Sequence, residues 1–159
     1  MKAWFLTASL VMILAHPMYA GNPDDLLGTW LNEEGTAKIE IFKQDGQFFG
    51  KIVWLKEPLY TQNDVDEADG HPLVKLGAQK VDYRNPDESL QSKPTLGLLI
   101  LRGFAYDADS EEWSGGFIYD PKKGKDYKAY MQMMEAGKLK LRGYIGFSLI
   151  GRTSYWTRA

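Results

Sequence analysis

Apolar and polar residues alternate with a period of two along much of the chain, which is typical of β-strands that bury one face. Ala37, Ile39 and Ile41 alternate with charged residues early in the chain, and Leu139 and Leu141 do the same near its end. The pattern predicts about eight strands, at residues 26–31, 36–43, 47–54, 98–106, 113–119, 126–134, 138–142 and 152–158.

The connections between most of these strands are short and contain turn-forming residues. They lie at residues 32–35, 44–46, 107–111, 120–124 and 135–137, and Gly143, Gly146 and Gly151 permit the bend before the last strand. Short turns join antiparallel neighbours into a meander, and pairing of the first strand with the last removes the free edges of the sheet. We therefore predict an all-β fold, an antiparallel up-and-down barrel of about eight strands.

One connection between strands is much longer than the others. Residues 55–97, after the third strand, form an insertion of roughly 40 residues, far longer than a usual hairpin loop, which indicates a functional or partly structured segment. Within it, residues 74–83 could add a short strand. Residues 85–91 favour one or two helical turns ended by Pro94.

The N-terminus has the pattern of a signal peptide. Lys2 is followed by an apolar run at residues 3–15, and Ala20 provides a small residue for cleavage. An uncleaved anchor is the alternative, but the run is shorter than the roughly 20 residues that span a bilayer. We expect residues 1–20 to be removed and residues 21–159 to form a single barrel domain with no membrane span, in the periplasm or secreted.

Charge and cysteine content limit the classes of binding partner and the cellular compartment that the sequence favours. Without residues 1–20 the chain has 18 basic and 21 acidic side chains, a formal net charge of −3. This acidic balance argues against nucleic acid and against anionic lipid as partners. Cysteine is absent, so no disulfide can support the fold, and export without disulfides suits a bacterial periplasm or secreted fluid.

Residues 28–30 read G-T-W at the start of the first expected strand, and the last strand carries two arginines. This arrangement resembles the lipocalin and wider calycin pattern, in which a first-strand tryptophan packs under an arginine of the last strand. The resemblance implies that Gly28, Trp30, Arg152 and Arg158 close one end of the barrel. Their expected role is structural, because a guanidinium stacks on an indole without burying a bare charge.

A longer set of motifs is similar to a family of small exported bacterial proteins known mainly by a domain-of-unknown-function label. The motifs are Gly28-Thr29-Trp30, Asn85-Pro86-Asp87, Pro94 with Leu96-Gly97-Leu98, Gly103-Phe104, Trp113 with Gly116, Tyr119-Asp120-Pro121, Leu141-Arg142-Gly143-Tyr144, Gly146-Phe147 and Gly151-Arg152-Thr153. This resemblance covers essentially all of residues 21–159. It implies a lipocalin-like barrel outside the cytoplasm and no settled activity.

Aromatic residues are the richest candidates for a binding site. Those on the expected strands are Trp54, Phe104, Trp113, Phe117, Tyr119, Tyr127 and Tyr144, and Trp54 is expected to face inward. They either fill the barrel or line a cavity, because an eight-stranded barrel is just wide enough for either arrangement. We predict that the protein binds or carries a small, largely apolar ligand in the barrel mouth, with the insertion as a lid and no cofactor. The alternative is an interaction module of the cell envelope with a filled barrel.

Metal and enzyme hypotheses find less support. The acidic run at residues 64–70 fails as a calcium loop, since Ala68 and Lys75 stand where ligands are needed, and His71 is the only histidine after residue 20. We predict no metal site. A carboxylate-based enzyme would need its acids and a cation in one cleft, the candidates being Asp82, Asp87 and Asp120 with Arg102 or Arg142. Turn and cap roles explain these acids equally well, so no catalytic residue is assigned.

Overall fold

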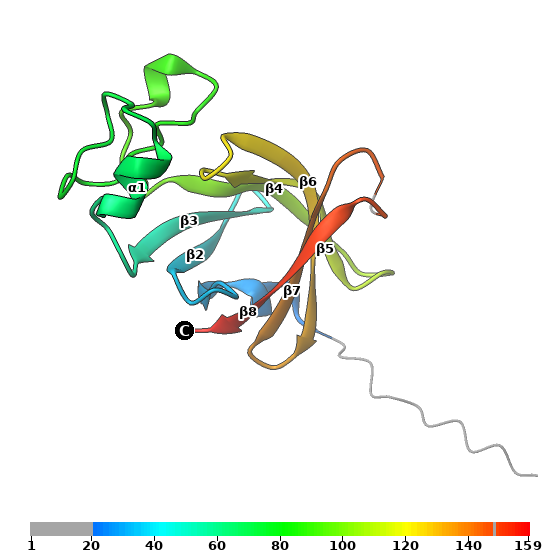
Figure 1. Cartoon of the computed structure of the whole chain (residues 1–159). Helices are drawn as coiled ribbons and strands as arrows, with labels where there is room; N and C mark the ends of the chain where they lie inside the picture. The colour runs from blue at the N-terminus through cyan, green and yellow to red at the C-terminus, as the bar shows by residue number, and fades with distance from the viewer. Residues whose placement is uncertain (1–20, 148) are drawn as a thin grey trace, which may run out of the picture.

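The computed structural model describes residues 21–147 and 149–159. Its core is a closed antiparallel barrel of eight strands in which every strand pairs with its sequence neighbour and the last pairs with the first (Figure 1). The expected signal peptide, residues 1–20, lies outside the described residues. In the described ranges, no helix is long and apolar enough to cross a membrane.

The strands follow the predicted order, which confirms the up-and-down barrel. They are β1 (Gly28–Leu31), β2 (Ala37–Gln44), β3 (Gln47–Leu55), β4 (Leu99–Asp107), β5 (Glu112–Asp120), β6 (Lys125–Glu135), β7 (Lys138–Tyr144) and β8 (Gly151–Arg158). Because the strands alternate in direction, the β1–β2, β3–β4, β5–β6 and β7–β8 connections lie at one end, here called the open end. The other end, here called the closed end, holds the N-terminal 3-10 helix η1 (Pro23–Leu26).

The pairing of β1 with β8 closes the barrel, with Trp30 opposite Arg158. The Arg158 guanidinium lies 4.1 Å from the centre of the Trp30 ring and donates hydrogen bonds to the Leu27 and Asp25 carbonyl oxygens at 2.6 and 2.5 Å. A methyl group on Gly28 would lie 2.8 Å from Arg158 Nη1, so glycine leaves room for this contact. The closed end is therefore covered by a stacked arginine and the η1 backbone.

Arg152 has a different position from Arg158. It lies at the open end of β8, is largely exposed, and forms an ion pair of 2.7 Å with Glu34 of the β1–β2 turn. It joins the last strand to the first turn without contacting Trp30.

Apolar side chains pack the barrel interior. Trp30, Phe48, Phe104, Trp113 and Met131 are all fully buried there, which is the outcome expected for the inward positions of alternating strands. Inward glycines lie directly under these large side chains. A methyl group on Gly116 would lie 2.5 Å from the Phe104 ring. This level of the barrel is filled by side chains.

A β-bulge reverses the orientation of the β3 end. Ile39 pairs with Ile52, but the next pair is Lys38 with Trp54, so Val53 is the extra residue. Trp54 consequently points outward, is 40% exposed, and lies under the Lys38 ammonium at 5.5 Å. The expectation that Trp54 faces inward is wrong, because the bulge shifts the period-two alternation by one residue.

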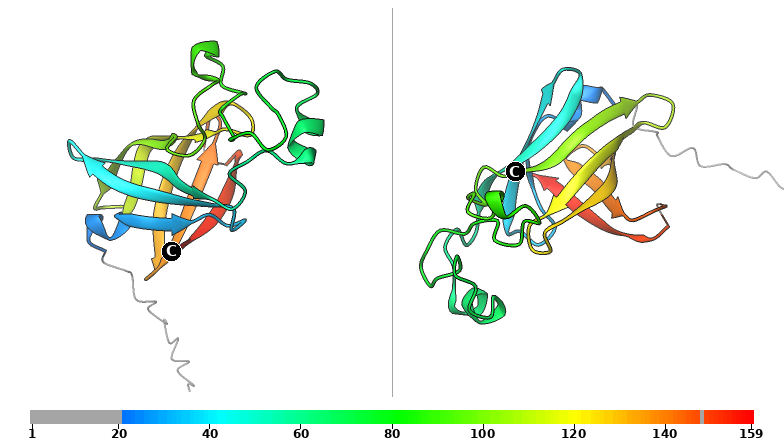
Figure 2. Two further views of the ribbon diagram at one scale, coloured as in Figure 1. Left: turned by 90° about the vertical axis from the view of Figure 1, so that its left-hand side faces the viewer. Right: turned by 90° about the horizontal axis from the view of Figure 1, so that it is seen from above.

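The insertion between β3 and β4 is ordered and stands beside the open end (Figure 2). It contains a short helix α1 (Gln62–Glu67) and a 3-10 turn η2 (Glu88–Leu90), of which only η2 was predicted. The predicted strand at residues 74–83 is wrong, since this segment makes only isolated bridges, Leu59 with Gln79 and Val81 with Pro94. These bridges fold the insertion back on itself.

The helix α1 begins at a reciprocal cap. The Thr61 side chain accepts a hydrogen bond from the Asp64 backbone N–H, and the Asp64 carboxylate accepts one from the Thr61 backbone N–H. Asp64 also pairs with Lys80 at 3.0 Å. The acidic run that superficially suggests a calcium loop thus begins as a capped helix.

Candidate functional site

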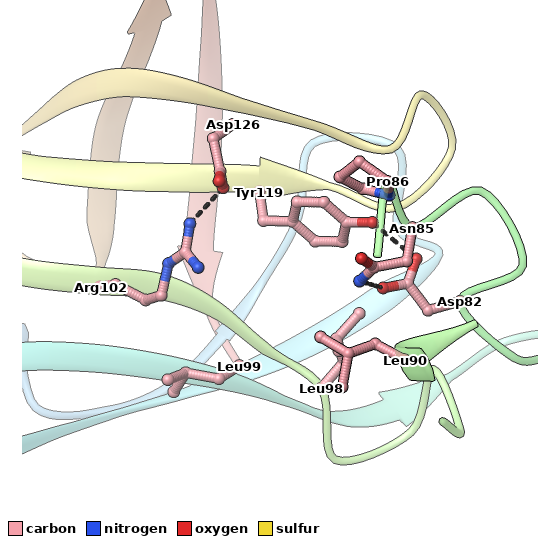
Figure 3. Close-up of a pocket in the computed structure, with 9 residues that line it drawn as sticks. All are labelled: Asp82, Asn85, Pro86, Leu90, Leu98, Leu99, Arg102, Tyr119 and Asp126. Carbon is pink, nitrogen blue, oxygen red and sulfur yellow. Dashed lines mark hydrogen bonds and ion pairs between the residues drawn. The ribbon is translucent and has the colours of Figure 1, made fainter. Parts of the chain in front are cut away.

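A cavity of about 240 Å³ lies between the insertion and the barrel wall (Figure 3), and it is called the rim pocket here. The insertion contributes Asp82, Asn85, Pro86 and Leu90. The barrel side contributes Leu98, Leu99, Arg102, Tyr119 and Asp126. The pocket therefore exists only where the insertion folds against β4, β5 and β6 near the open end.

Strand alternation places the rim pocket on the outer face of the barrel. Ile118 packs against the core, so its neighbours Phe117 and Tyr119 point outward. Arg102 pairs with Phe117 across β4 and β5, and Tyr119 pairs with Asp126 across β5 and β6. Tyr119 is nevertheless buried, because the insertion covers its ring.

Asp82 is the one charged residue that the described part of the chain buries, with an exposed fraction of 1%. The Tyr119 hydroxyl donates to its Oδ1 at 2.8 Å, and the Asn85 amide donates to its Oδ2 at 2.7 Å. The Asp82 backbone is held as well, since its N–H donates to the Lys93 carbonyl and its carbonyl accepts from the Asn85 N–H. The hydrogen bond from Tyr119 to Asp82 fastens the insertion to the barrel wall.

Burial raises the pKa of the Asp82 carboxyl, because the charged form loses contact with water, and the hydrogen bonds from Asn85 and Tyr119 offset part of that effect. Burial also raises the pKa of the Tyr119 phenol, with the hydrogen bond to Asp82 as the next cause. The phenol therefore keeps its proton at neutral pH and donates it to Asp82.

A second polar pair lies at the pocket edge. Arg102 of β4 forms an ion pair with Asp126 of β6, and both side chains remain partly exposed. Leu90, Leu98 and Leu99 form the apolar part of the lining below them (Figure 3). The pocket thus combines an apolar surface with a buried acid at one side and a solvent-facing guanidinium at the other.

The predicted aromatic site residues do not converge. Phe104 and Trp113 are packed in the core, and Tyr119 lines the rim pocket. Phe117 and Trp54 are exposed on the outer face. No shared cavity brings these five residues together.

The remaining two aromatic candidates lie on β6 and β7. Tyr127 is half-buried and pairs with the inward-facing Ile118. Tyr144 pairs with Lys128 on the outer face, where its ring centre lies 6.5 Å from that of Tyr130. Of the seven aromatic candidates, only Tyr119 borders the rim pocket.

The acids considered for catalysis are separated as well. Asp87 caps η2 by accepting from the Ser89 N–H, and Asp120 accepts from the Lys122 N–H in the β5–β6 turn. Asp82 alone reaches the rim pocket, where Arg102 is the nearby cation. In the described ranges, no group of three or more His, Cys, Asp or Glu residues could hold a metal ion.

Sequence reasoning missed six pocket residues, namely Asn85, Pro86, Leu90, Leu98, Leu99 and Asp126. The D-x-x-N spacing from Asp82 to Asn85 is a local turn signal. It does not show that the turn packs on a barrel strand.

Comparison with known proteins gives a family and a fold. The family model described as "Uncharacterized protein conserved in bacteria (DUF2147)" matches residues 28–158. No curated protein matches the chain.

Among solved structures, the protein HP1028 from Helicobacter pylori, which its title assigns to the lipocalin family, has a similar fold. The two chains are 21% identical, the match covers 84% of this chain and 82% of that one, and the TM-score is 0.64. The barrel described above is therefore lipocalin-like.

Proposed function

We propose that this chain, which belongs to the bacterial DUF2147 family, is an exported protein that binds or carries a small, largely apolar molecule. The observation that carries the proposal is the rim pocket, in which three leucine side chains form an apolar surface beside fixed polar groups. Small-molecule sites in proteins have this composition. Its volume of about 240 Å³ suits a ligand smaller than a typical drug.

The polar groups differ in what they offer a ligand. Tyr119 donates its only hydrogen to Asp82, so it orients the acid and presents its ring to the pocket. Asp82 can accept a further hydrogen bond, because each carboxylate oxygen has two lone pairs. Arg102 faces the open side and suits an acidic group. An apolar molecule with one polar end fits these positions.

The insertion is expected to control access to the pocket. Four lining residues come from the insertion, and the Asp82 hydrogen bond to Tyr119 joins them to the barrel. Movement of residues 82–90 away from Tyr119 would uncover the ligand. The proposed lid therefore lies over the outer wall of the barrel and not over its mouth, where the sequence placed it.

Export is part of the proposal, and residues 1–20 motivate it. Cleavage after Ala20 would release a chain starting at Gly21. Sequencing the N-terminus of protein recovered from the periplasm or the medium tests this. Retention of Lys2 in the recovered protein would contradict it.

Binding can be tested with octanoate, an apolar chain with one carboxylate. Leucine methyl groups labelled for NMR should respond selectively during a titration. Leu90, Leu98 and Leu99 line the pocket, whereas Leu139 and Leu141 lie inside the barrel. We expect saturable shifts of the first three and little change in the other two. Shifts confined to Leu139 and Leu141 would instead place the ligand in the barrel.

A matched pair of variants makes the test sharper. Leu99→Trp fills the pocket from a partly exposed position, and Leu73→Trp adds the same bulk at an equally exposed insertion site outside the pocket. Octanoate binding should be lost in the first variant and kept in the second. Equal binding by both variants would show that octanoate does not bind in the rim pocket.

An interaction module of the cell envelope is the second candidate. The packing of Phe104 over Gly116 and of Leu101 over Gly50 favours it, because the barrel is filled at that level and could work through its surface. Absence of any methyl shift with octanoate, together with capture of a stable protein partner from the same compartment, would favour this candidate.

A further inference from the structure

Asp82 is a buried acid whose side-chain hydrogen bonds all come from uncharged groups. The Tyr119 hydroxyl donates to one carboxylate oxygen, and the Asn85 amide donates to the other. In the part of the chain that the structure describes, no cationic side chain forms an ion pair with Asp82. The same carboxylate lines the rim pocket. Since a buried charge is stabilised by an opposite charge beside it, a ligand cation at this side of the pocket would be favoured.

The cationic side chains closest to Asp82 in the chain have other partners. Lys80 pairs with Asp64 at 3.0 Å, and Arg84 Nε donates to the Tyr83 hydroxyl at 2.8 Å. Neither of them lines the rim pocket. The protein therefore supplies the two ends of its insertion contact with neutral donors and keeps its nearby positive charges elsewhere.

The charged side chains of the pocket lining leave one negative charge over. Asp82 and Asp126 are acids and Arg102 is a base, so the formal charge of the lining is −1 when Asp82 is ionised. Arg102 and Asp126 form an ion pair at the pocket edge. The negative charge without a counter-charge consequently belongs to Asp82.

Asp82 also keeps hydrogen-bonding capacity for a ligand. Each carboxylate oxygen has two lone pairs, and each Asp82 oxygen receives one side-chain hydrogen bond. A primary ammonium group carries the opposite charge and offers three donors in a compact volume. A metal ion fits less well, because Ca²⁺ and Mg²⁺ take about six oxygen ligands or more. Only two carboxylates line the pocket.

The lining also sets the direction in which such a ligand would lie. Figure 3 shows Asp82 and Arg102 on opposite sides of the pocket, with the Tyr119 ring between them. An aliphatic chain that starts at Asp82 would therefore cross an apolar surface toward Arg102. An acidic group at the far end of the chain would meet a guanidinium there, whereas the reverse orientation would bring two negative charges together at Asp82.

We propose that the rim pocket takes a primary aliphatic amine, with its ammonium group paired to Asp82 and its chain along Leu90, Leu98 and Leu99. The inference rests on the proposed function, because it specifies the chemical class of the ligand in the same pocket. The pair forms in a poorly solvated site, where opposite charges attract more strongly than in water.

Three ligands of equal chain length test the charge at the Asp82 end. Octanoate, 8-hydroxyoctanoate and 8-aminooctanoate share the carboxylate that suits Arg102 and differ only at the other end. Titration at neutral pH, followed by the methyl shifts of Leu90, Leu98 and Leu99, gives a Kd for each. We expect 8-aminooctanoate to bind about tenfold more tightly than octanoate, because a hydrogen bond between charged groups is added. The neutral hydroxyl should gain clearly less.

Three variants assign this preference to the Asp82 charge. Asp82→Asn keeps the size of the side chain and should abolish the advantage of the amine over octanoate. Glu67→Gln, at an exposed position of α1 outside the pocket, removes the same charge from the molecule and should keep the advantage. Tyr119→Phe removes a donor but keeps the acid, so the advantage should persist even where both ligands bind more weakly. A purely structural role of Asp82 would change both Kd values together and leave their ratio unchanged.

Ligand orientation gives a measurement that needs no variant. A nuclear Overhauser effect should join the methylene group next to the ligand nitrogen to the Asn85 amide, which donates to the same carboxylate. The methylene next to the ligand carboxylate should contact Leu99, which lies on β4 with Arg102. The opposite pattern would overturn the inference.

The outcomes separate this inference from the proposed function. Equal binding of the amine and the hydroxyl ligand, or an advantage of the amine that survives in Asp82→Asn, would overturn the inference while octanoate binding in the rim pocket stands. Absence of methyl shifts with all three ligands would overturn both.

Discussion

At the level of single residues, the two arginines of β8 show that the position of a charged side chain decides how much it contributes to stability. Arg158 stacks on Trp30 and donates to two backbone carbonyls of the closed end. Arg152 makes an exposed ion pair with Glu34. Both arginines are exposed, but one stacks on a buried tryptophan and the other makes only an ion pair.

Replacement of each arginine by alanine should separate these roles. Arg158→Ala should lower the free energy of unfolding by about 1–3 kcal/mol, because a cation–π contact and charged hydrogen bonds are lost. Arg152→Ala should change it by about 0–1 kcal/mol, as for other exposed ion pairs. Urea unfolding of both variants checks this. Equal effects would contradict the assignment of Arg158 to barrel closure.

Asp82 should give a pH dependence of unusual sign. Its folded pKa is raised above the ordinary value of 3.8, so the unfolded chain releases the proton first. The stability that Asp82 contributes is present below pH 3.8 and is lost as the pH rises through the folded pKa. Most acids stabilised in a folded protein have the opposite sign.

The variant Asp82→Asn isolates this effect, since it keeps the size of the side chain and cannot titrate. The difference in unfolding free energy between the parent and the variant should fall as the pH rises above 3.8, by about 1.4 kcal/mol for each unit by which the pKa is raised. Urea unfolding at several pH values measures it. A difference that stays constant or grows with pH would show that Asp82 is not buried as described.

At the level of elements, the insertion and the β5–β6 turn meet at a backbone contact. A methyl group on Gly124 would lie 1.9 Å from the Arg84 carbonyl oxygen. Gly124 has φ +62°, and Gly46, in the β2–β3 turn, has φ +78° with no atom within 4 Å of such a methyl group. The two glycines share a left-handed backbone conformation but not the close contact.

Alanine at each glycine should therefore give different results. Gly46→Ala should cost only the left-handed backbone strain, about 1 kcal/mol. Gly124→Ala should in addition push the insertion away from the turn and raise hydrogen exchange across residues 82–90. Hydrogen exchange with mass spectrometry compares them. The same exchange at residues 82–90 in both variants would mean that the insertion is held elsewhere.

At the level of the whole molecule, the barrel and the insertion have separate apolar clusters. The barrel cluster contains no residue of the insertion between Leu55 and Leu98. Tyr60 and Val74 are buried within the insertion. The barrel should consequently fold without most of the insertion.

Replacement of residues 58–94 by a short glycine-containing turn tests this independence. The backbone bonds from Gly97 to Ile52 and from Ile52 to Leu98 remain, so β3 and β4 keep their pairing. The shortened protein should unfold in one cooperative transition at lower stability, because Tyr119 becomes exposed, and should lose octanoate binding. Loss of near-ultraviolet circular dichroism would show that the barrel needs the insertion.

The barrel could be predicted from the sequence because inward and outward positions alternate and short turns join neighbouring strands. Leu139 and Leu141 show the principle, since both are buried where the alternation places them. Trp54 shows its limit, because a bulge at Val53 depends on the register between two strands. The helix α1 was missed although Thr61 and Asp64 form a capping pair.

The candidate site could not be predicted in the same way. Asp82, Arg102, Tyr119 and Asp126 come from separate elements, and alternation assigns the last three to an outer face that would ordinarily meet water. Only the folded insertion covers that face and buries Tyr119. The sequence by itself determined the strands, their order and the closed barrel, because these follow from local periodicity and short-range turns. The tertiary structure alone decided where the pocket lies, because contacts between distant segments depend on how their surfaces pack.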